Sequence, residues 1–153
     1  MLLLGFSAGL PNLLIFDTLS AWLRESGQTL EVIGFFALAT LSYSLKFVWA
    51  PLIDRAPFPV LSRILGRRRG WVIFTQVTLL AVIVGMGFTD PARDLWWTAL
   101  FAVIVATASA SQDIVLDAYR IEIIEEHQYA AGAATMVFGW RIGQVGGAAA
   151  GLI

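Results

Sequence analysis

The feature that most constrains this chain is a pair of stretches without a single charged residue, Val72–Thr89 and Leu95–Gln112. In a soluble domain about a quarter of all residues are charged, and charges recur every few positions. Here 14% of the 153 residues are charged and 58% are hydrophobic. Crossing ~30 Å of hydrocarbon takes about 20 apolar residues as a helix. The sequence therefore argues against a soluble domain and predicts an all-α bundle of transmembrane helices.

Five apolar runs have the length needed to cross a bilayer. We predict spans at about 1–23, 30–53, 71–89, 95–116 and 129–153, with only short connections between them. The first run has no basic start and no small-residue cleavage pattern, so we expect a retained helix and not a signal peptide. Because the last run reaches Ile153 without a polar tail, we expect 1–153 to be a partial N-terminal transmembrane domain, cut from a larger bundle.

Positive charge gathers in one of the connections. The segment 54–70 has five basic residues, whereas the connections near Arg24 and Arg93 have one each. Basic loops stay on the cytoplasmic side of a membrane. Alternation then predicts that residue 1 and the connection 117–128 are cytoplasmic as well. The basic residues of the segment 54–70 are Arg55, Arg63, Arg67, Arg68 and Arg69.

No feature indicates an enzyme, a metal site or a nucleic-acid partner. The net charge is −1, so there is no basic surplus to attract a polyanion. With no cysteine and the single histidine His127, a metal site would rest almost wholly on carboxylates. Phosphate-binding loops, dinucleotide fingerprints and Ser-His-Asp arrangements are absent from the sequence. We expect no catalytic residue, no metal and no bound cofactor.

Four ionisable residues fall inside the predicted spans, where charge is costly and usually functional. They are Asp17, Lys46, Asp113 and Arg141. Arg141 lies ~18 Å into its span, near the midplane. Gly139, Gly143, Gly147 and Gly151 form a stripe at i, i+4 spacing, and Arg141 points roughly 140° away from it. We predict that the glycine face packs on a neighbouring helix and that Arg141 faces a cavity. A structural ion pair of Arg141 with Asp17 or Asp113 is the alternative.

The end of the fourth span carries a polar face. Ser109, Asp113, Asp117 and Arg120 follow the spacing i, i+4, i+8, i+11. A buried carboxylate with a like-charged neighbour suits proton exchange, which makes Asp113 and Asp117 candidates. Alternatively, Asp117 and Arg120 are interfacial and only Asp113 matters. Lys46 either meets Asp113, binds an anionic substrate or reaches toward the interface, and Asp17 is a further proton-coupling candidate.

Several motifs carry a family resemblance. They read GFSAGLP (5–11), AWLRESG (21–27), YSLKFVWAPLIDR (43–55), GRRRGW (66–71) and QDIVLDAYRIE (112–122). Together they resemble the N-terminal part of AmpG-like muropeptide permeases, within the major facilitator superfamily. The superfamily signature between helices 2 and 3 resembles Asp54, Arg55, Gly66, Arg67 and Arg68, which makes these residues gating candidates. Ala50 replaces the usual leading glycine, and an insertion interrupts the loop.

The resemblance implies a twelve-helix carrier that brings anhydro-muropeptides from periplasm to cytoplasm across the bacterial inner membrane, driven by the proton gradient. It places Gln112, Asp113 and Asp117 in a family hallmark and puts helices 1, 2, 4 and 5 around the central cavity. We expect Arg141 and Lys46 to attract the carboxylates of this anionic sugar-peptide and Gln112 to hydrogen-bond it. The other partners are the bilayer and the remaining helices. A carrier of acetyl-CoA or another anionic solute, or a non-transporting membrane assembly subunit, is the alternative.

Overall fold

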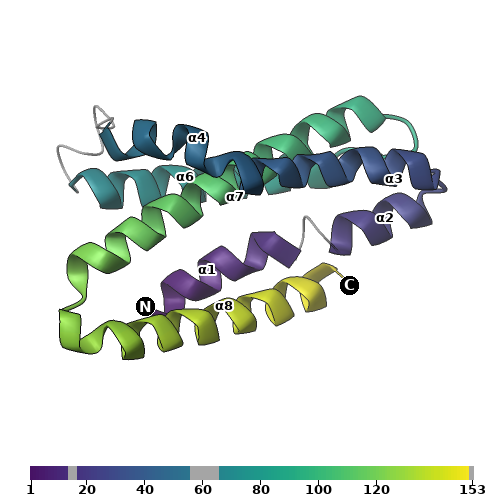
Figure 1. Ribbon diagram of the computed structural model, residues 1–153. Coiled ribbons are helices and arrows are strands. Elements are labelled where there is room, and N and C mark those ends of the chain that lie inside the picture. The colour runs from purple at the N-terminus through teal and green to yellow at the C-terminus, as the bar shows by residue number, and fades with distance from the viewer. Residues whose placement is uncertain (14–16, 56–65, 152–153) are drawn as a thin grey trace.

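The computed structural model describes residues 1–13, 17–55 and 66–151, and within these ranges all regular structure is helical (Figure 1). Gly27 and Gly66 adopt positive φ angles of 75° and 83°, which glycine tolerates and which here end one helix and precede another. The elements are α1 (Leu2–Leu13), α2 (Leu19–Glu25), α3 (Leu30–Ala37), η2 (Leu38–Thr40), α4 (Leu41–Arg55), α6 (Arg67–Gly87), α7 (Leu95–Ile123), η3 (Glu126–Gln128) and α8 (Tyr129–Gly151).

The structure confirms an all-α bundle with membrane-spanning character. Among the described residues, α6 and α7 are by themselves long and apolar enough to cross a bilayer. The predicted span 1–23 contains α1 and α2, and residues 14–16 lie outside the described ranges. The predicted span 30–53 is carried by α3 and α4, which the short 3₁₀ turn η2 joins end to end.

One predicted boundary needs correction. We expected the fourth span to end at Leu116 and a connection to begin at Asp117, but α7 continues to Ile123. The segment after Leu116 contains neither glycine nor proline, so nothing in it stops the helix. Asp117 and Arg120 therefore stay in helical register with Asp113. Of the basic connection, residues 56–65, including Arg63, lie outside the described ranges, while Arg67–Arg69 form the first turn of α6.

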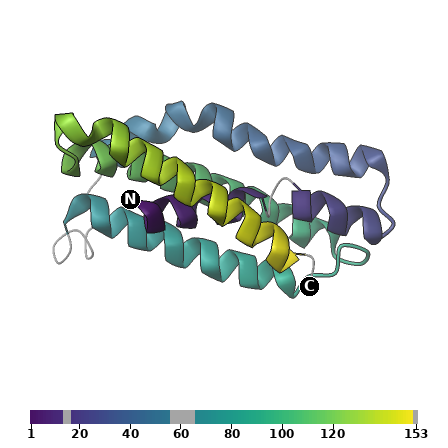
Figure 2. The same ribbon diagram turned by 90° about the horizontal axis from the view of Figure 1, so that it is seen from below.

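Helix α7 runs through the middle of the bundle. It contacts α1, α4 and α6, and it supplies residues to each of three buried apolar clusters. Figure 2 shows the bundle from below, with α6 and the α3–α4 pair on opposite sides of α1 and α8. The buried residues from α7 in these clusters are Ala102, Val105, Ala106, Val115 and Leu116.

Helices α1 and α8 lie side by side along an interface made of glycine. A methyl group added at Gly139, Gly143 or Gly147 would meet the backbone carbonyls of Leu2, Phe6 and Leu10 in turn. A step of four residues along α8 thus matches a step of four residues in the same direction along α1. The two helices therefore run parallel, as Figures 1 and 2 show. The predicted packing role of these glycines is confirmed.

Helix α1 also contributes glycines to its interface with α8. A methyl group at Gly5 or Gly9 of α1 would overlap the backbone of Met136 or Trp140 in α8. Small residues on both sides let two backbones approach closely, as in membrane helix pairs. We call this interface the glycine seam; it consists of Gly5, Gly9, Gly139, Gly143 and Gly147.

Candidate functional site

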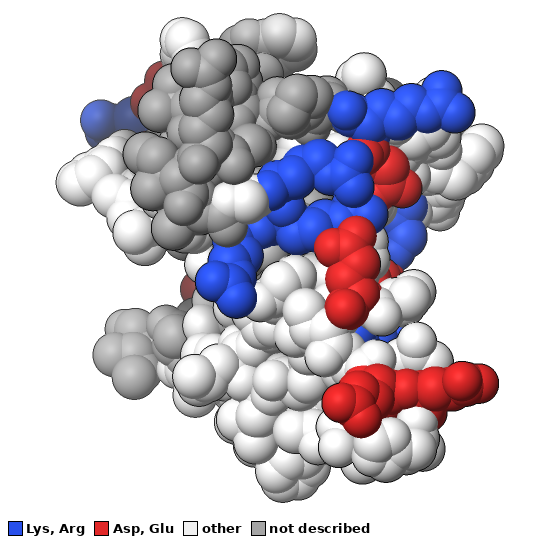
Figure 3. All heavy atoms as spheres, turned by 90° about the vertical axis from the view of Figure 1, so that its left-hand side faces the viewer, with Lys and Arg blue, Asp and Glu red and all other residues white. Residues whose placement is uncertain are grey.

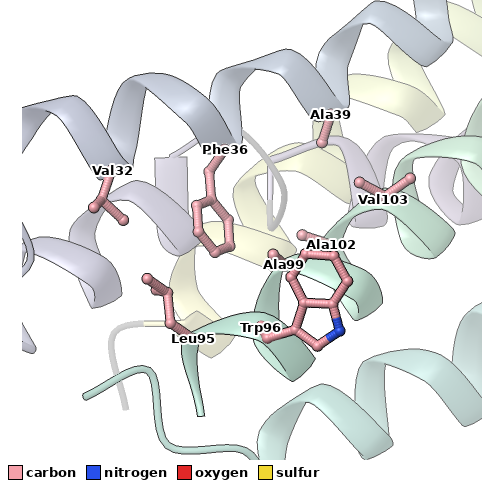
Figure 4. A pocket seen from close by; sticks show the side chains of 8 residues that line it. All are labelled: Val32, Phe36, Ala39, Leu95, Trp96, Ala99, Ala102 and Val103. Atoms are coloured by element: carbon pink, nitrogen blue, oxygen red, sulfur yellow. The ribbon is translucent and has the colours of Figure 1, made fainter. Parts of the chain in front are cut away.

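An apolar groove of about 500 Å³ lies between α3 and α7 near the start of both helices (Figure 4). Val32 and Phe36 of α3 face Leu95 and Trp96 of α7 across it. None of its eight lining residues carries a charge. Its lining offers an anionic solute no charged partner, and charged side chains meet elsewhere in the bundle.

A smaller pocket of about 190 Å³ lies where α7 meets α1 and α8, and two of the three predicted proton-coupling residues, Asp113 and Asp117, line it. Asp113, Asp117 and Arg120 line it from α7, while α1 and α8 supply only apolar side chains. An Arg120 Nη2 lies 3.4 Å from Asp117 Oδ1, and Asp117 is 53% exposed. The polar face predicted from helical spacing is thus present, and its outer carboxylate is already paired with Arg120.

Asp113 is partly buried and lies between opposing charges. Lys46 of α4 attracts its carboxylate, and Asp117 repels it. Among the described residues, Asp113 has no ion pair within 4 Å. The ion pairs in this part of the chain are made by other carboxylates. The predicted meeting of Lys46 and Asp113 is therefore an electrostatic one, without direct contact.

Arg141 is exposed on α8, on a different face from the glycine seam. Its guanidinium carbon lies 5.1 Å from the centre of the Trp140 ring, and Nη1 donates to Gln144 Oε1 at 3.5 Å. The described part of the chain contains no ion pair of Arg141 with Asp17 or Asp113, so the structural ion pair considered above is not formed. Asp17 itself is exposed, in the single turn that precedes α2.

Gln112 does not line the pocket of its neighbour Asp113. Its side chain is 1% exposed, and Nε2 donates to Ser7 Oγ on α1 at 3.3 Å. Gln76 of α6 donates to the same hydroxyl at 3.3 Å. Gln112 Oε1 has no hydrogen-bond partner within the described residues. In this conformation Gln112 joins α7 to α1 and α6, and its substrate-binding role stays a prediction.

Polar residues that the sequence did not indicate join helices in two pairs beside Asp113. Tyr43 of α4 donates to Ser109 of α7 at 2.8 Å, and Asn12 of α1 lies near the Tyr43 hydroxyl. Gln144 of α8 donates to Asn12 Oδ1 at 3.4 Å. No signal in one helix predicts these contacts, because each partner comes from a different span.

The gating candidates gather at one end of the bundle, where Figure 3 shows basic and acidic side chains side by side. Arg68 of α6 bridges two carboxylates: Nη1 lies 2.6 Å from Asp54 of α4, and Nε lies 2.8 Å from Glu122 of α7. Arg67 donates to the Asp54 carbonyl oxygen at 2.6 Å. Glu122 was missed as a candidate, although it belongs to the motif 112–122.

The other gating candidates surround this bridge. Arg55 is exposed at the end of α4, and Gly66 is the residue before α6. Arg69 Nε donates to the Tyr119 hydroxyl at 3.3 Å. The Arg68 bridge, as we call Asp54, Arg68 and Glu122, thus ties the ends of α4, α6 and α7 together.

Comparisons with known proteins agree with the resemblance in the motifs. The chain is 45% identical to the anhydromuropeptide permease of Escherichia coli strain K12 over 145 residues, which is 95% of this chain and 29% of that protein. It is 39% identical to putative transporter AmpG 4 of Rickettsia felis over 94% of this chain and 34% of that protein. The chain thus spans about a third of the length of these curated relatives.

A family model described as acetyl-coenzyme A transporter 1 matches residues 1–92, which is more than half of the chain. The relatives named permease or transporter extend the similarity over the remaining helices. The resemblance to AmpG-like permeases is thereby confirmed, and the chain belongs to the transporter family that this model describes.

Proposed function

We propose that this chain forms part of a proton-coupled secondary transporter that imports anhydro-muropeptides across the bacterial inner membrane, with residue 1 on the cytoplasmic side. The observation that carries the proposal is the partly buried Asp113, held between Lys46 and Asp117 where α7 meets α1 and α8. A carboxylate inside a membrane bundle is costly, so its presence indicates a function. The substrate class comes from the relative named anhydromuropeptide permease.

Substrate binding is assigned to Arg141, Lys46 and Gln112. Anhydro-muropeptides carry peptide carboxylates, and the exposed Arg141 guanidinium offers donors in a fixed fork that matches them. Lys46 adds a second positive charge from α4. Gln112 would become available only if α1 separates from α7, since its amide is now bonded to Ser7.

Proton coupling is assigned to Asp113, with Asp117 and Asp17 as further candidates. Protonation of Asp113 would remove the charge that Lys46 attracts and Asp117 repels. A change of charge in a medium of low dielectric shifts the balance between two conformations. The proton gradient would in this way favour one orientation of the cavity.

The Arg68 bridge is assigned to gating, together with Arg55, Gly66 and Arg67. Charge-assisted hydrogen bonds from one arginine to two carboxylates hold the ends of three helices in one geometry. Opening of the bundle toward the cytoplasm would have to separate these ends, so the bridge would stabilise the closed state.

The test uses the full-length transporter that contains this segment, reconstituted in liposomes. We expect Asp113→Asn to abolish accumulation of anhydro-muropeptide driven by a pH gradient and to leave exchange of internal for external substrate intact. The matched control is Asp94→Asn, the same change at the exposed start of α7. Loss of both accumulation and exchange in a folded Asp113→Asn protein would refute a role in proton coupling.

Two alternative functions are transport of acetyl-CoA and a role as an assembly subunit. The name of the family model favours acetyl-CoA as substrate, and competition between acetyl-CoA and anhydro-muropeptide for uptake decides between them. An assembly subunit would use its glycines to bind a partner, but the glycine seam is filled within this chain by α1 and α8. Accumulation of either solute against its gradient would exclude the assembly subunit.

A further inference from the structure

The Ser7 hydroxyl of α1 joins three helices at one atom. Gln76 Nε2 of α6 and Gln112 Nε2 of α7 each donate to Ser7 Oγ at 3.3 Å. Ser7 in turn donates to the Leu4 carbonyl oxygen of its own helix at 2.9 Å. A hydroxyl group has one hydrogen and two acceptor sites, so the full hydrogen-bonding capacity of Ser7 is in use. We call Ser7, Gln76 and Gln112 the Ser7 junction.

The Ser7 junction satisfies only one half of the Gln112 amide. The Gln112 side chain is 1% exposed, and among the residues that the structure describes its Oε1 has no hydrogen-bond partner. A buried acceptor without a donor has lost its hydration and received no bond in return. A conformation that gives Oε1 a donor is therefore favoured by the removal of this penalty. The bond to Ser7 opposes that change, because it keeps Gln112 in its buried position.

The helix that carries Ser7 is packed on the helix that carries Arg141. The glycine seam brings α1 and α8 together backbone to backbone, and such close approach stabilises a pair of membrane helices. If α1 separates from α7, α8 follows α1, and the position of Arg141 relative to Gln112 changes. The Ser7 junction is thus a point at which the helices of the two substrate-binding candidates are held together.

We propose that Ser7 and Gln76 are positioning residues that keep Gln112 withdrawn from the substrate and thereby set the affinity for it. The proposal rests on the proposed function, in which Gln112 hydrogen-bonds the sugar-peptide, and it names what holds that amide back. A hydroxyl or amide N–H group of the substrate supplies the donor that Gln112 Oε1 lacks, and a substrate carbonyl accepts from Nε2 in place of Ser7. Substrate and Ser7 therefore compete for one amide.

This competition predicts that weakening the junction raises the affinity for substrate. The apparent Kd of a ligand that binds one of two conformations falls as that conformation becomes more populated. A hydrogen bond between membrane helices shifts such an equilibrium about threefold on average. Ser7→Ala removes the acceptor of both amides, so we expect its Kd to fall about eightfold. Gln76→Met removes one of the two bonds, so we expect a fall of about threefold.

A double mutant cycle connects this gain to Gln112 itself. Gln112→Ala alone should raise the Kd, because the substrate loses a hydrogen-bonding partner. In the Gln112→Ala background only the bond of Gln76 to Ser7 remains, so Ser7→Ala should now lower the Kd about threefold and not eightfold. A structural defect that is unrelated to Gln112 would change the Kd by the same factor in both backgrounds.

The structure supplies a matched control for the loss of a hydroxyl group between helices. Ser42 Oγ of α4 lies 3.1 Å from Thr107 Oγ1 of α7, and neither residue belongs to the Ser7 junction. Ser42→Ala should leave the Kd within about twofold of wild type, whereas a general loosening of the bundle would act through both variants. If Ser7→Ala fails to fold, Gln76→Met still tests the proposal, since it leaves the bond between Gln112 and Ser7 in place.

The measurement is the Kd of anhydro-muropeptide for the purified full-length transporter, determined by titration calorimetry. An unchanged or higher Kd in both Ser7→Ala and Gln76→Met would overturn the proposal, as would an equal fall in Ser42→Ala. Equal effects of Ser7→Ala with and without Gln112 would show that the junction does not act through this amide. If the wild-type transporter binds no anhydro-muropeptide, the proposed function fails as well; wild-type binding with any of the other results rejects the positioning role alone.

Discussion

The glycine seam and the α4–α7 contact join neighbouring helices by opposite means. In the seam the side chains are missing, and backbone meets backbone between α1 and α8. Between α4 and α7, three side-chain hydrogen bonds span the gap, at 3.1, 2.8 and 3.1 Å. We call these three contacts the hydroxyl ladder; they are Ser42–Thr107, Tyr43–Ser109 and Trp49–Ser111.

This difference between the two interfaces indicates which pair of helices can shift relative to each other. An interface without side chains has one good geometry, because any added atom meets a carbonyl group. Hydroxyl groups rotate and accept new partners, so a ladder of them can shift register at modest cost. We infer that α1 and α8 move as one body and that α4 and α7 can adjust against each other.

The largest effect is expected in the seam. Gly143→Val places a branched side chain against the Phe6 carbonyl and should lower the free energy of unfolding by about 3 kcal/mol. Thermal unfolding of the purified protein in detergent measures the loss. The control is Gly34→Ala in α3, where an added methyl group has nothing within 4 Å, so stability should not fall and can rise by up to about 1 kcal/mol. Equal melting of the two variants would show that the close approach of α1 and α8 is absent.

A smaller effect is expected where ion pairs, and not packing, hold the α4 and α7 ends. Arg68→Ala removes both contacts of the Arg68 bridge, but Asp54 and Glu122 are 46% and 47% exposed, so we expect a loss of about 1 kcal/mol. High salt should shrink the difference from wild type. Arg93→Ala removes a pair at 3.7 Å between side chains that are 85% and 53% exposed, and should leave the melting temperature unchanged. A salt-independent loss in Arg68→Ala would point to packing instead.

Within the hydroxyl ladder, the largest loss of stability is expected where a substitution leaves a buried donor without its acceptor. Ser111→Ala removes the acceptor of the partly buried Trp49 indole N–H and should cost about 1 kcal/mol. Trp49→Phe combined with Ser111→Ala should restore part of this loss, because no polar group is then left unpaired. A double mutant cycle on melting temperatures checks the expectation, and strictly additive losses would contradict it.

The smallest effect is expected at the partly buried contact between Ser42 and Thr107. Ser42→Ala removes a contact between two hydroxyl groups and should cost about 0.6 kcal/mol, the average for hydrogen bonds between membrane helices. A loss as large as that of Gly143→Val would mean that the ladder is as rigid as the seam, and our comparison of the two would be wrong.

Composition and periodicity determined much of this protein. The charge-free stretches predict membrane helices because hydrocarbon tolerates few unpaired charges. The spacing of the α8 glycines predicts a packing face, and the structure confirms it with α1 as the partner. The turn spacing of Asp113, Asp117 and Arg120 predicts one polar face, because positions within a helix are fixed relative to each other.

What only the tertiary structure decided is which helix meets which. The two-carboxylate bridge at Arg68, the burial of Gln112 against Ser7, and the contact of Gln144 with Asn12 all join residues from different helices. Helical periodicity determines the direction of a side chain from its own axis, but the rotation and neighbours of that axis come from packing against the other helices. The physical reason is that intrahelical order depends on local backbone hydrogen bonds, whereas these contacts depend on how the whole bundle buries its surfaces.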